Sequence, residues 1–477
     1  MSTVKELPAS DAPGDGPALA AAKISLGQAL WYGFAALGLP ACLGTAGAYT
    51  MGAGNAAWLG LTLAAAAIGV LSIIIVGFAR KYLVSGSLMS YLRLELGNHA
   101  GRLGGAALTV GYAGAITSYL STVLYFGMGA LQGIGMPEIP LSVQIILAAV
   151  ILAACSLLQR QGVSVSVNAS IVLSFLVAPF VLLILGAVVI NRGVDIVPQL
   201  QLKGFSMTTF VPTVVIGFGT FVAFEGLTAL ARETKNSQRT LPVVVNALVA
   251  ALAVASLISI VITVPVLAQH SDQLMAGESP LHILAKVGGV PWAGFPADLL
   301  MAVSLGGALI AYINDSSRVV ATASRDGYLP RVLGRIHPHH RTPALAGSVM
   351  SCVAFVLMAT YLLLSNQGMY GVTLNFTSFM VYSWSVAYVA IAVAGIVAAV
   401  RFKRPAIIVP AIVVIAFLVA VAGYSITHST HTGEIFAGIV FGAIALVFIA
   451  TTLPRRGQVA TDADRAVDAT VMTAEEV

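Results

Sequence analysis

The chain has 477 residues, of which 58% are hydrophobic and 9% are charged, and its mean hydropathy is +0.93. Because soluble proteins carry about 25% charged residues, this chain has too few to cover a water-facing surface, and it is predicted to be an integral membrane protein. Its net charge of +5 does not gather on one soluble domain, as a nucleic-acid-binding surface would require, so no nucleic-acid partner is expected.

The two ends of the chain are predicted to be cytoplasmic tails without regular structure. Residues 1–24 are mostly polar and lack the charged-then-apolar pattern of a signal peptide. The first membrane span is therefore expected to serve as the uncleaved targeting signal. Residues 455–477 have the same polar character as the first tail.

Between the tails, apolar stretches near the roughly 20 residues that cross the hydrocarbon core predict twelve transmembrane helices in contact with lipid. The approximate spans are Leu26–Thr50, Ala56–Phe78, Leu103–Leu131, Leu141–Leu157, Val165–Ile190, Phe210–Ala231, Pro242–Leu267, Pro291–Ala321, Pro343–Leu364, Leu374–Val400, Ala406–Tyr424 and Ile435–Leu453. The division between the fourth and fifth spans depends on one short Gln-Arg-Gln-Gly turn.

The basic residues orient this arrangement. If the N-terminus is cytoplasmic, 21 of the 24 Lys and Arg residues fall on the cytoplasmic side, and only Arg192, Lys203 and Lys286 fall outside. Cytoplasmic loops carry an excess of Lys and Arg in membrane proteins. The distribution therefore predicts that both termini are cytoplasmic.

The first span carries helix breakers at mid-depth, between Gly38 and Gly47. Pro40 has no N–H and clashes with the preceding turn, and Gly44 allows backbone geometry that is closed to other residues. One half-helix is expected to end near Pro40–Ala41 and to offer free carbonyls for an ammonium group or a metal cation. A second is expected to begin near Gly44–Thr45, with free N–H groups that suit a carboxylate.

A second interrupted span carries a similar cluster over residues 217–226 and runs in the opposite direction. Its carbonyl end is expected near Gly219–Val222, and a new helical start near Phe224–Glu225. Irregular backbone inside a membrane is tolerated only where protein buries it or water reaches it, and matching breaks in two halves indicate a transporter's substrate site. Facing breaks would offer both N–H groups and carbonyls, which suits a zwitterion such as an α-amino acid.

Glu225 is the acidic residue placed nearest the middle of a span. A charge at mid-membrane costs about 3 kcal/mol on insertion scales, so it indicates function by default. It could carry a proton or bind a substrate amine, and the alternative is a carboxylate stabilised by a helix N-terminus. Phe221 and Phe224 could close over a bound side chain or simply pack.

The eighth span adds a polar group near its cytoplasmic end. Asp315 and Arg318 are three residues apart, so they are predicted to pair along one helix face, mainly as a structural pair. Ser316 and Ser317 could supply oxygen to a sodium ion, although hydroxyls that bond to their own helix are the commoner arrangement.

Metal and cofactor chemistry finds little support. The three cysteines, Cys42, Cys155 and Cys352, all fall in predicted spans, and neither CxxC nor HExxH spacing occurs. The histidines near His337–His340 could bind a metal in a membrane enzyme, but a basic cytoplasmic turn is favoured. No cofactor and no catalytic residue is predicted.

Four stretches, in this order along the chain, resemble motifs of amino acid permeases of the amino acid–polyamine–organocation superfamily. Ala53–Trp58 and Tyr91–Gly97 are similar to the start of the second helix and the loop before the third. Phe221–Gly226 with Ala231–Pro242 resembles the signature of the sixth helix. Ser317–Pro330, with Thr342-Pro343 beyond, resembles the exit from the eighth helix and the following loop.

The resemblance implies an all-α membrane fold of the LeuT type, with two inverted five-helix repeats at residues 25–191 and 205–401 and two further helices at 402–454. It implies that a substrate carboxylate meets the N–H groups of Gly44-Thr45-Ala46. It implies that the amine meets carbonyls near Ala41–Cys42 and near Gly219–Val222.

The sequence departs from the family pattern at several points. Ala46 replaces the usual second Gly, Pro40 stands where Gly is common, Ala223 replaces the Gly before the acidic position, and Ser237 replaces a frequent Pro. The fifth span has no Lys or Arg, so the lysine that stands in for sodium in some relatives is absent. A shifted site and an atypical substrate therefore stay open.

Together these features predict a secondary active transporter, not an enzyme, that moves an amino acid, polyamine or other amine across the plasma membrane by alternating access. Uptake coupled to protons or sodium is favoured over obligate exchange; a membrane enzyme and a channel are alternatives of other classes. The predicted substrate-binding residues are Ala41, Cys42, Gly44, Thr45, Ala46, Gly219, Phe221, Val222 and Glu225. The ion-coupling candidates are Glu225, Ser316 and Ser317.

Overall fold

The computed structural model describes residues 24–84, 86–137, 139–365, 368–428, 431–452 and 470–471. Apart from β1 (Tyr82–Leu83), which pairs antiparallel with β2 (Thr470–Val471), every regular element in these ranges is helical. The first predicted tail lies almost wholly outside the described residues, and only β2 of the second is described. The prediction of an all-α membrane protein is confirmed.

The first half of the chain forms nine α-helices and one 3₁₀ turn within the described ranges. They are α1 (Leu26–Ala36), α2 (Leu39–Thr50), η1 (Met51–Ala56), α3 (Ala57–Lys81), α4 (Leu88–Leu96), α5 (Asn98–Gly133), α6 (Leu141–Arg160), α7 (Val163–Phe175), α8 (Ala178–Arg192) and α9 (Val197–Leu200).

The second half follows with nine more α-helices and four 3₁₀ turns. They are α10 (Met207–Gly219), η2 (Gly226–Glu233), α11 (Ser237–Ala268), α12 (Ser271–Met275), α13 (Pro280–Val287), η3 (Pro291–Ala293), α14 (Gly294–Arg325), η4 (Arg331–Gly334), α15 (Ala344–Leu364), α16 (Met369–Arg401), η5 (Pro405–Ile407), α17 (Ile408–Thr427) and α18 (His431–Thr452).

In the described part of the chain, nine helical segments are long and apolar enough to cross a membrane. The first of them, Leu26–Lys81, contains α1, α2, η1 and α3, and two shorter apolar helices lie at Met207–Gly219 and Gly438–Thr452. Each predicted span coincides with a helix or a pair of helices. The total of twelve crossings stays a prediction.

The fifth predicted span is interrupted, which the sequence analysis missed. Helix α7 ends at Phe175 and α8 begins at Ala178, with Pro179 in its first turn. A proline ring clashes with the carbonyl four residues earlier, here that of Phe175, so the two helices cannot continue as one. Proline instead fits the first turn of a new helix, where its missing N–H would have no partner.

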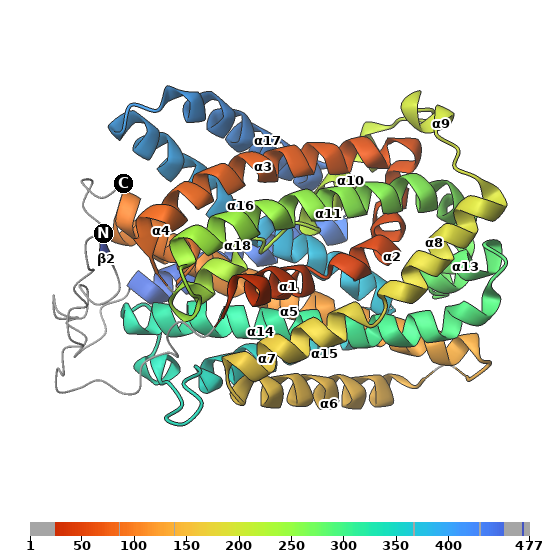
Figure 1. The fold of residues 1–477 in the computed structure, drawn as a ribbon, viewed down its shortest axis with the longest axis horizontal. Coiled ribbons are helices and arrows are strands. Elements are labelled where there is room, and N and C mark those ends of the chain that lie inside the picture. The colour runs from red at the N-terminus through yellow and green to blue at the C-terminus, as the bar shows by residue number, and fades with distance from the viewer. Residues whose placement is uncertain are drawn as a thin grey trace.

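The long helices run side by side along one axis (Figure 1), and α5 and α14 pack against each other in the interior. Helix α5 also packs closely on α16. A Cβ added at Gly111 would lie 2.5 Å from the Trp384 ring, and one at Gly114 would lie 2.5 Å from Phe379. Small residues that let backbones approach in this way are typical of helix contacts in membranes.

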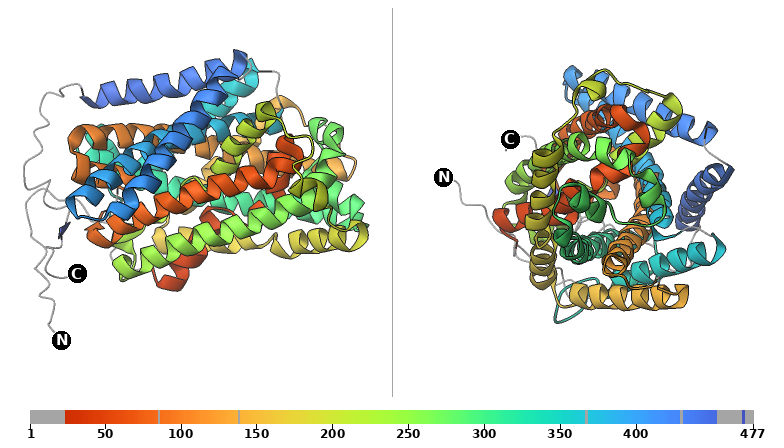
Figure 2. Two further views of the ribbon diagram at one scale, coloured as in Figure 1. Left: turned by 90° about the horizontal axis from the view of Figure 1, so that it is seen from above. Right: turned by 90° about the vertical axis from the view of Figure 1, so that its right-hand side faces the viewer.

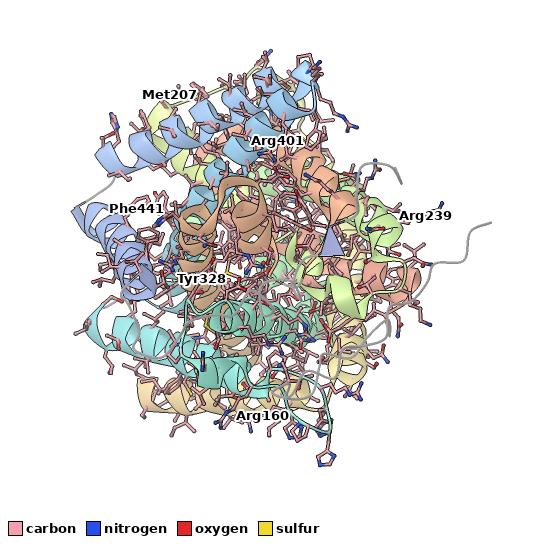
Figure 3. The ribbon with its side chains drawn as sticks, turned by 90° about the vertical axis from the view of Figure 1, so that its left-hand side faces the viewer. Arg160, Met207, Arg239, Tyr328, Arg401 and Phe441 are labelled. Atoms are coloured by element: carbon pink, nitrogen blue, oxygen red, sulfur yellow. The ribbon has the colours of Figure 1, made fainter. Side chains whose placement is uncertain are left out.

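One end of the bundle carries a network of charged side chains (Figure 3), where Arg160, Arg239 and Arg401 are visible. Glu95 of α4 accepts hydrogen bonds from the Tyr82 hydroxyl at 2.7 Å, Lys81 at 3.0 Å and Arg401 at 3.3 Å. In addition, Arg93 of α4 forms an ion pair with Asp326, just after α14. Helix α4 thus ties the ends of α3, α14 and α16 together.

The opposite end is covered by α12 and α13 (Figure 2, right). Helix α13 contacts α2, α8, α11 and α14. The His282 ring fits against two glycines, since a Cβ at Gly133 or Gly294 would lie within 2.8 Å of it. Burial lowers the pKa of His282, and the nearby Lys286 lowers it further, so this position favours the neutral imidazole.

Candidate functional site

The first helix break lies between α1 and α2, at Leu37–Gly38. Gly38 has a left-handed backbone (φ 61°, ψ 45°), which is open to glycine at little cost. Helix α2 then begins at Leu39 with Pro40 in its first turn. Its first i→i−4 hydrogen bond runs from the Cys42 N–H to the Gly38 carbonyl at 2.8 Å, so the N–H groups of Leu39 and Ala41 precede the helical ladder.

The predicted position of this break is therefore wrong. Gly44, Thr45 and Ala46 lie inside α2, and their N–H groups are not at a helix start. The Ala41 carbonyl accepts a hydrogen bond from Thr45 Oγ1 at 2.9 Å and belongs to the same helix. Pro40 was interpreted as the end of the first half-helix, whereas a proline is also favoured in the first turn of the next one.

The second break is longer and agrees with the predicted position. Helix α10 ends at Gly219, the chain turns through Thr220–Glu225, and a 3₁₀ helix, η2, starts at Gly226. Ala223 has a left-handed backbone with φ 66°, a conformation that costs an L-residue about 1–2 kcal/mol. Its N–H is held by the Tyr388 hydroxyl of α16 at 3.2 Å.

A cavity of about 70 Å³ lies between the two breaks. It opens onto the start of α2 and the end of α10, and α5 and α16 supply most of the rest of its wall. Within the described residues its lining carries no charged side chain. The lining consists of Leu37, Gly38, Ala41, Cys42, Thr45, Ala46, Tyr49, Ser118, Tyr119, Thr122, Ile216, Gly219, Thr220, Leu305, Thr373, Thr377 and Met380.

Five predicted substrate-binding residues line this cavity, namely Ala41, Cys42, Thr45, Ala46 and Gly219. The other four do not. Gly44 faces Met301 and Leu281 instead, and Phe221 is fully buried among other side chains. The Val222 carbonyl, expected to meet an amine, accepts a hydrogen bond from the Tyr312 hydroxyl at 3.2 Å.

Glu225, the fourth, is fully buried and holds the second break to α16. One carboxylate oxygen accepts the Trp384 Nε1–H at 2.8 Å, and the other accepts the Tyr388 hydroxyl at 2.8 Å. The side chain makes no hydrogen bond that caps η2. No hydrogen bond therefore supports the alternative interpretation of Glu225 as a carboxylate that stabilises a helix N-terminus. Because Tyr388 also contacts the Ala223 N–H, these side chains fix the turn as a unit.

The ion-coupling candidates on α14 are engaged with their own helix. The Ser316 hydroxyl donates to the Ile313 carbonyl at 3.0 Å, and the Ser317 hydroxyl donates to the Asn314 carbonyl at 2.7 Å. Both serines are fully buried, and neither lines the cavity. This is the commoner arrangement of hydroxyls in membrane helices.

The predicted pair of Asp315 with Arg318 is wrong. Arg318 instead forms a buried, two-pronged ion pair with Glu233 of η2, with N–O distances of 2.6 Å and 3.0 Å. A guanidinium matches a carboxylate best through two parallel hydrogen bonds, which Asp315 on the same helix face does not supply. Asp315 accepts the Tyr32 hydroxyl of α1 at 3.2 Å.

Hydroxyl groups from α5 and α16 form a polar wall that the sequence analysis did not identify. Ser118 lies 2.8 Å from the Thr377 hydroxyl, and Thr122 donates to Thr373 at 3.2 Å. Each helix contributes two hydroxyl residues four positions apart, which places them on one face. This four-residue spacing could have indicated a shared face. The sequence does not show, however, which face of α5 or α16 points toward the cavity.

Three tyrosines lie together on the side of the cavity nearest α13. Tyr49, which lines the cavity, stacks on Tyr370 with ring centroids 6.4 Å apart, and Tyr125 lies 5.5 Å from Tyr370. Tyr370 donates to the Ala48 carbonyl at 3.1 Å, and Tyr125 donates to the Glu278 carbonyl at 2.9 Å. These bonds connect α2, α5, α16 and the segment before α13 on this side of the cavity.

The histidine turn brings two imidazole rings together. The His337 and His340 rings lie 4.9 Å apart, and the His340 N–H contacts His337 Nδ1 at 3.3 Å. In the described ranges no three His, Cys, Asp or Glu side chains come together in a way that could hold a metal ion.

Comparison with known proteins gives a consistent result. The family model described as amino acid permease matches residues 30–461. An uncharacterised transporter of Mycobacterium tuberculosis is 26% identical over 322 residues, which cover 65% of this chain and 67% of the relative. A branched-chain amino acid permease of Bacillus subtilis is 24% identical over 347 residues, covering 65% of this chain and 70% of the relative.

A solved structure that the chain matches is that of Mhp1, a nucleobase-cation-symport-1 family transporter in a closed conformation with bromovinylhydantoin bound. The TM-score is 0.46 at 14% identity, and the match covers 89% of this chain and 99% of that one. A likeness at this level carries no conclusion about the site.

Proposed function

Because the chain belongs to the amino acid permease family, we propose that it is a secondary active transporter that moves an amino acid or related amine across the plasma membrane by alternating access. The observation that carries this proposal is the cavity between two helix breaks. Ligand sites of such transporters are formed by discontinuous helices that point their ends at the substrate.

The two helix ends suit the two charges of a zwitterion. The start of α2 presents the N–H groups of Leu39 and Ala41 and the positive end of a helix dipole, which favour a carboxylate. The end of α10, at Ile216–Thr220, presents the carbonyl end of a helix to the same cavity, which favours an ammonium group. The proposed binding residues are therefore Ala41, Cys42, Thr45, Ala46 and Gly219.

The wall of the cavity favours a substrate with a neutral side group. Its described lining combines apolar side chains such as Leu305 and Met380 with hydroxyl groups such as Thr122 and Thr373. A cationic side group would enter without a counter-ion, and burying an unpaired charge is costly. A neutral amino acid therefore fits better than a polyamine, in agreement with the branched-chain substrate named for the Bacillus subtilis relative.

The architecture proposed for this activity has twelve crossings. Segment Leu26–Lys81 would cross twice, and the two shorter apolar helices would each cross once. Residues 25–191 and 205–401 would form the inverted repeats, with 402–454 appended. The end that carries Arg160, Arg239 and Arg401 (Figure 3) would face the cytoplasm, in keeping with the positive-inside rule.

Uptake driven by protons or sodium is the proposed mode, and obligate exchange is the rival. The test is uptake of labelled neutral and cationic amino acids and a polyamine into proteoliposomes. A proton gradient, a sodium gradient, or internal substrate without a gradient would be applied in turn. Concentrative uptake of a neutral amino acid under one gradient would support the proposal, and transport that needs internal substrate would favour the exchanger.

A matched pair of variants tests the cavity itself. Ala46→Leu would fill space in the cavity and should abolish uptake. Ala66→Leu makes the same change on the exposed face of α3 and should leave uptake intact. Equal uptake by both variants would contradict the assignment of the cavity as the substrate site.

A further inference from the structure

Asp315 lies at a junction of three elements. Its side chain is on α14 and is 4% exposed. One carboxylate oxygen accepts the hydroxyl of Tyr32 from α1 at 3.2 Å. The other faces η2 so closely that a Cβ added at Gly226 would lie 2.5 Å from it. Asp315 therefore touches one half of each broken helix, and it is not among the residues that line the cavity.

The charge of Arg318 acts on Asp315 from nearby, but within the described part of the chain its hydrogen bonds go to other groups. Arg318, three residues along, uses its guanidinium on Glu233 and on the Asn314 carbonyl. Across the described residues no ion pair to Asp315 is formed, and Glu225 on the neighbouring turn is a further acid held by Trp384 and Tyr388. Glu233 thus takes the two-pronged contact with the one guanidinium of this region, and Asp315 is left with the Tyr32 hydroxyl.

An unused hydroxyl group points to a ligand at this place. Tyr112 of α5 is 1% exposed, and its hydroxyl has no hydrogen-bond partner among the described residues. The position of a Cβ at Gly226 is 3.7 Å from that hydroxyl and 2.5 Å from the Asp315 oxygen, so both groups face the same spot. A buried carboxylate without a counter-ion is stable only if it gains a proton or a cation.

The site is linked to the cavity by tyrosine rings. Tyr112 lies 6.3 Å from Tyr312, and Tyr312 lies 4.6 Å from Tyr119, which lines the cavity. The Tyr312 hydroxyl also holds the Val222 carbonyl in the second break. A change at Asp315 can therefore reach the substrate through packed side chains that contact the moving segments.

We infer that Asp315 binds the proton that drives transport. The inference rests on the proposed function and names its coupling site. A protonated Asp315 can remain buried while α1 and η2 close against α14, whereas an ionised one is stable only when these segments separate and water enters. The proton is taken up from one side of the membrane and released to the other.

A sodium ion fits this place less well. Hard cations require a shell of several oxygen ligands, and the Ser316 and Ser317 hydroxyls that could contribute are bonded to carbonyls of α14. The groups that face Asp315 from neighbouring elements are Tyr32, Tyr112, Glu225 and Glu233, with Arg318 and Tyr312 on its own helix. Among them the Tyr32 hydroxyl donates a hydrogen bond to Asp315, and the Tyr312 hydroxyl donates to the Val222 carbonyl.

The test compares Asp315→Asn with Asp298→Asn in proteoliposomes. Asp298 is a second fully buried aspartate of α14, and it is bonded to Ser279 at the opposite end of the helix. Proton-driven accumulation should fall about tenfold or more in Asp315→Asn, as expected for loss of a coupling interaction, while exchange against internal substrate persists. Asp298→Asn should keep proton-driven accumulation.

Tyr32→Phe provides a second variant that retains the carboxyl group. Loss of the hydroxyl removes a hydrogen bond to the charged form of Asp315, so the midpoint of the pH dependence of uptake should move to higher pH. Unchanged accumulation and pH profile in both variants, with an active wild type, would overturn this inference alone. Accumulation by the wild type on sodium and not on protons would also overturn it. A wild type that neither accumulates nor exchanges any amino acid would overturn the proposed function as well.

Discussion

The two helix breaks differ in how they are held. The first is two residues long and depends on the backbone, since a left-handed Gly38 and the first-turn Pro40 restart the helix. The second extends over Thr220–Glu225 and depends on side chains that reach it from α14 and α16. The first break can therefore be altered by one backbone substitution, whereas the second requires loss of a buried polar contact.

Because they are held differently, the two breaks are suited to different roles in transport. The first break borders the cavity through Gly38 and Ala41, and its geometry is local. The second is coupled to the helices around it through Glu225, Glu233 and the Val222 carbonyl. Movement of the second break must therefore rearrange contacts with α14 and α16, which makes it the better place to couple an ion to substrate movement.

The largest expected effect comes from breaking the buried pair that fixes η2. Arg318→Met would leave Glu233 buried without a partner, and the free energy of unfolding should fall by about 3–5 kcal/mol. Denaturant unfolding in detergent measures this. Lys286→Met is the control, because it breaks the more exposed pair with Glu278 and should change stability by about 1 kcal/mol or less. Equal losses of stability in the two variants would show that the buried pair of Arg318 with Glu233 contributes no more than the exposed pair of Lys286 with Glu278.

Glu225→Gln should lower stability less than Arg318→Met does, and it tests whether Glu225 is a structural residue or the proton carrier. The amide retains one acceptor, so either Trp384 or Tyr388 loses a good hydrogen bond, and stability should fall by about 1–3 kcal/mol. Proton-driven accumulation should persist, because Asp315 is proposed to carry the proton. Loss of accumulation at nearly unchanged stability would instead make Glu225 the proton carrier.

The first break is tested by Gly38→Ala. The left-handed backbone at φ 61° is strained for alanine by about 1–2 kcal/mol, and displacement of the N–H groups should also weaken substrate binding. Gly27→Ala is the control, because Gly27 lies inside α1 with no atom within 4 Å of the added Cβ. The control should be neutral or stabilising by up to about 1 kcal/mol. Thermal stability and substrate affinity should therefore both fall in Gly38→Ala, whereas Gly27→Ala should keep its substrate affinity and lose no stability.

The helices and the second break could both be predicted because each depends on short-range features of the sequence. Apolar length and glycine clusters are local signals, and Gly217, Gly219 and the acidic Glu225 mark the second break in one short stretch. The first break was misplaced because Pro40 is compatible with both the end of one helix and the start of the next. Only the path of the chain before Pro40 distinguishes the two.

The contacts that hold the site were beyond local reasoning. Arg318 pairs with Glu233, 85 positions away in the chain, although Asp315 is much nearer in sequence. The hydroxyl wall depends on the rotation of α5 and α16, which are apolar around most of their surface and so give no face to orient them. Asp315 drew no functional prediction because its expected partner was on the same helix.

The smallest expected effect is at the left-handed residue of the second break. Ala223→Gly should relieve backbone strain of about 1–2 kcal/mol, while the freer unfolded chain offsets about 0.4–1 kcal/mol of that gain. The variant should therefore be more stable by up to about 1.6 kcal/mol, whereas Ala66→Gly, on the exposed face of α3, should be less stable by about 1 kcal/mol. Unfolding measurements on both decide this. A stabilising Ala223→Gly would mean that the Tyr388 and Glu225 contacts hold the turn against strain. A destabilising one would mean that the turn relies on its own backbone, as the first break does, and the distinction between the two breaks would fail.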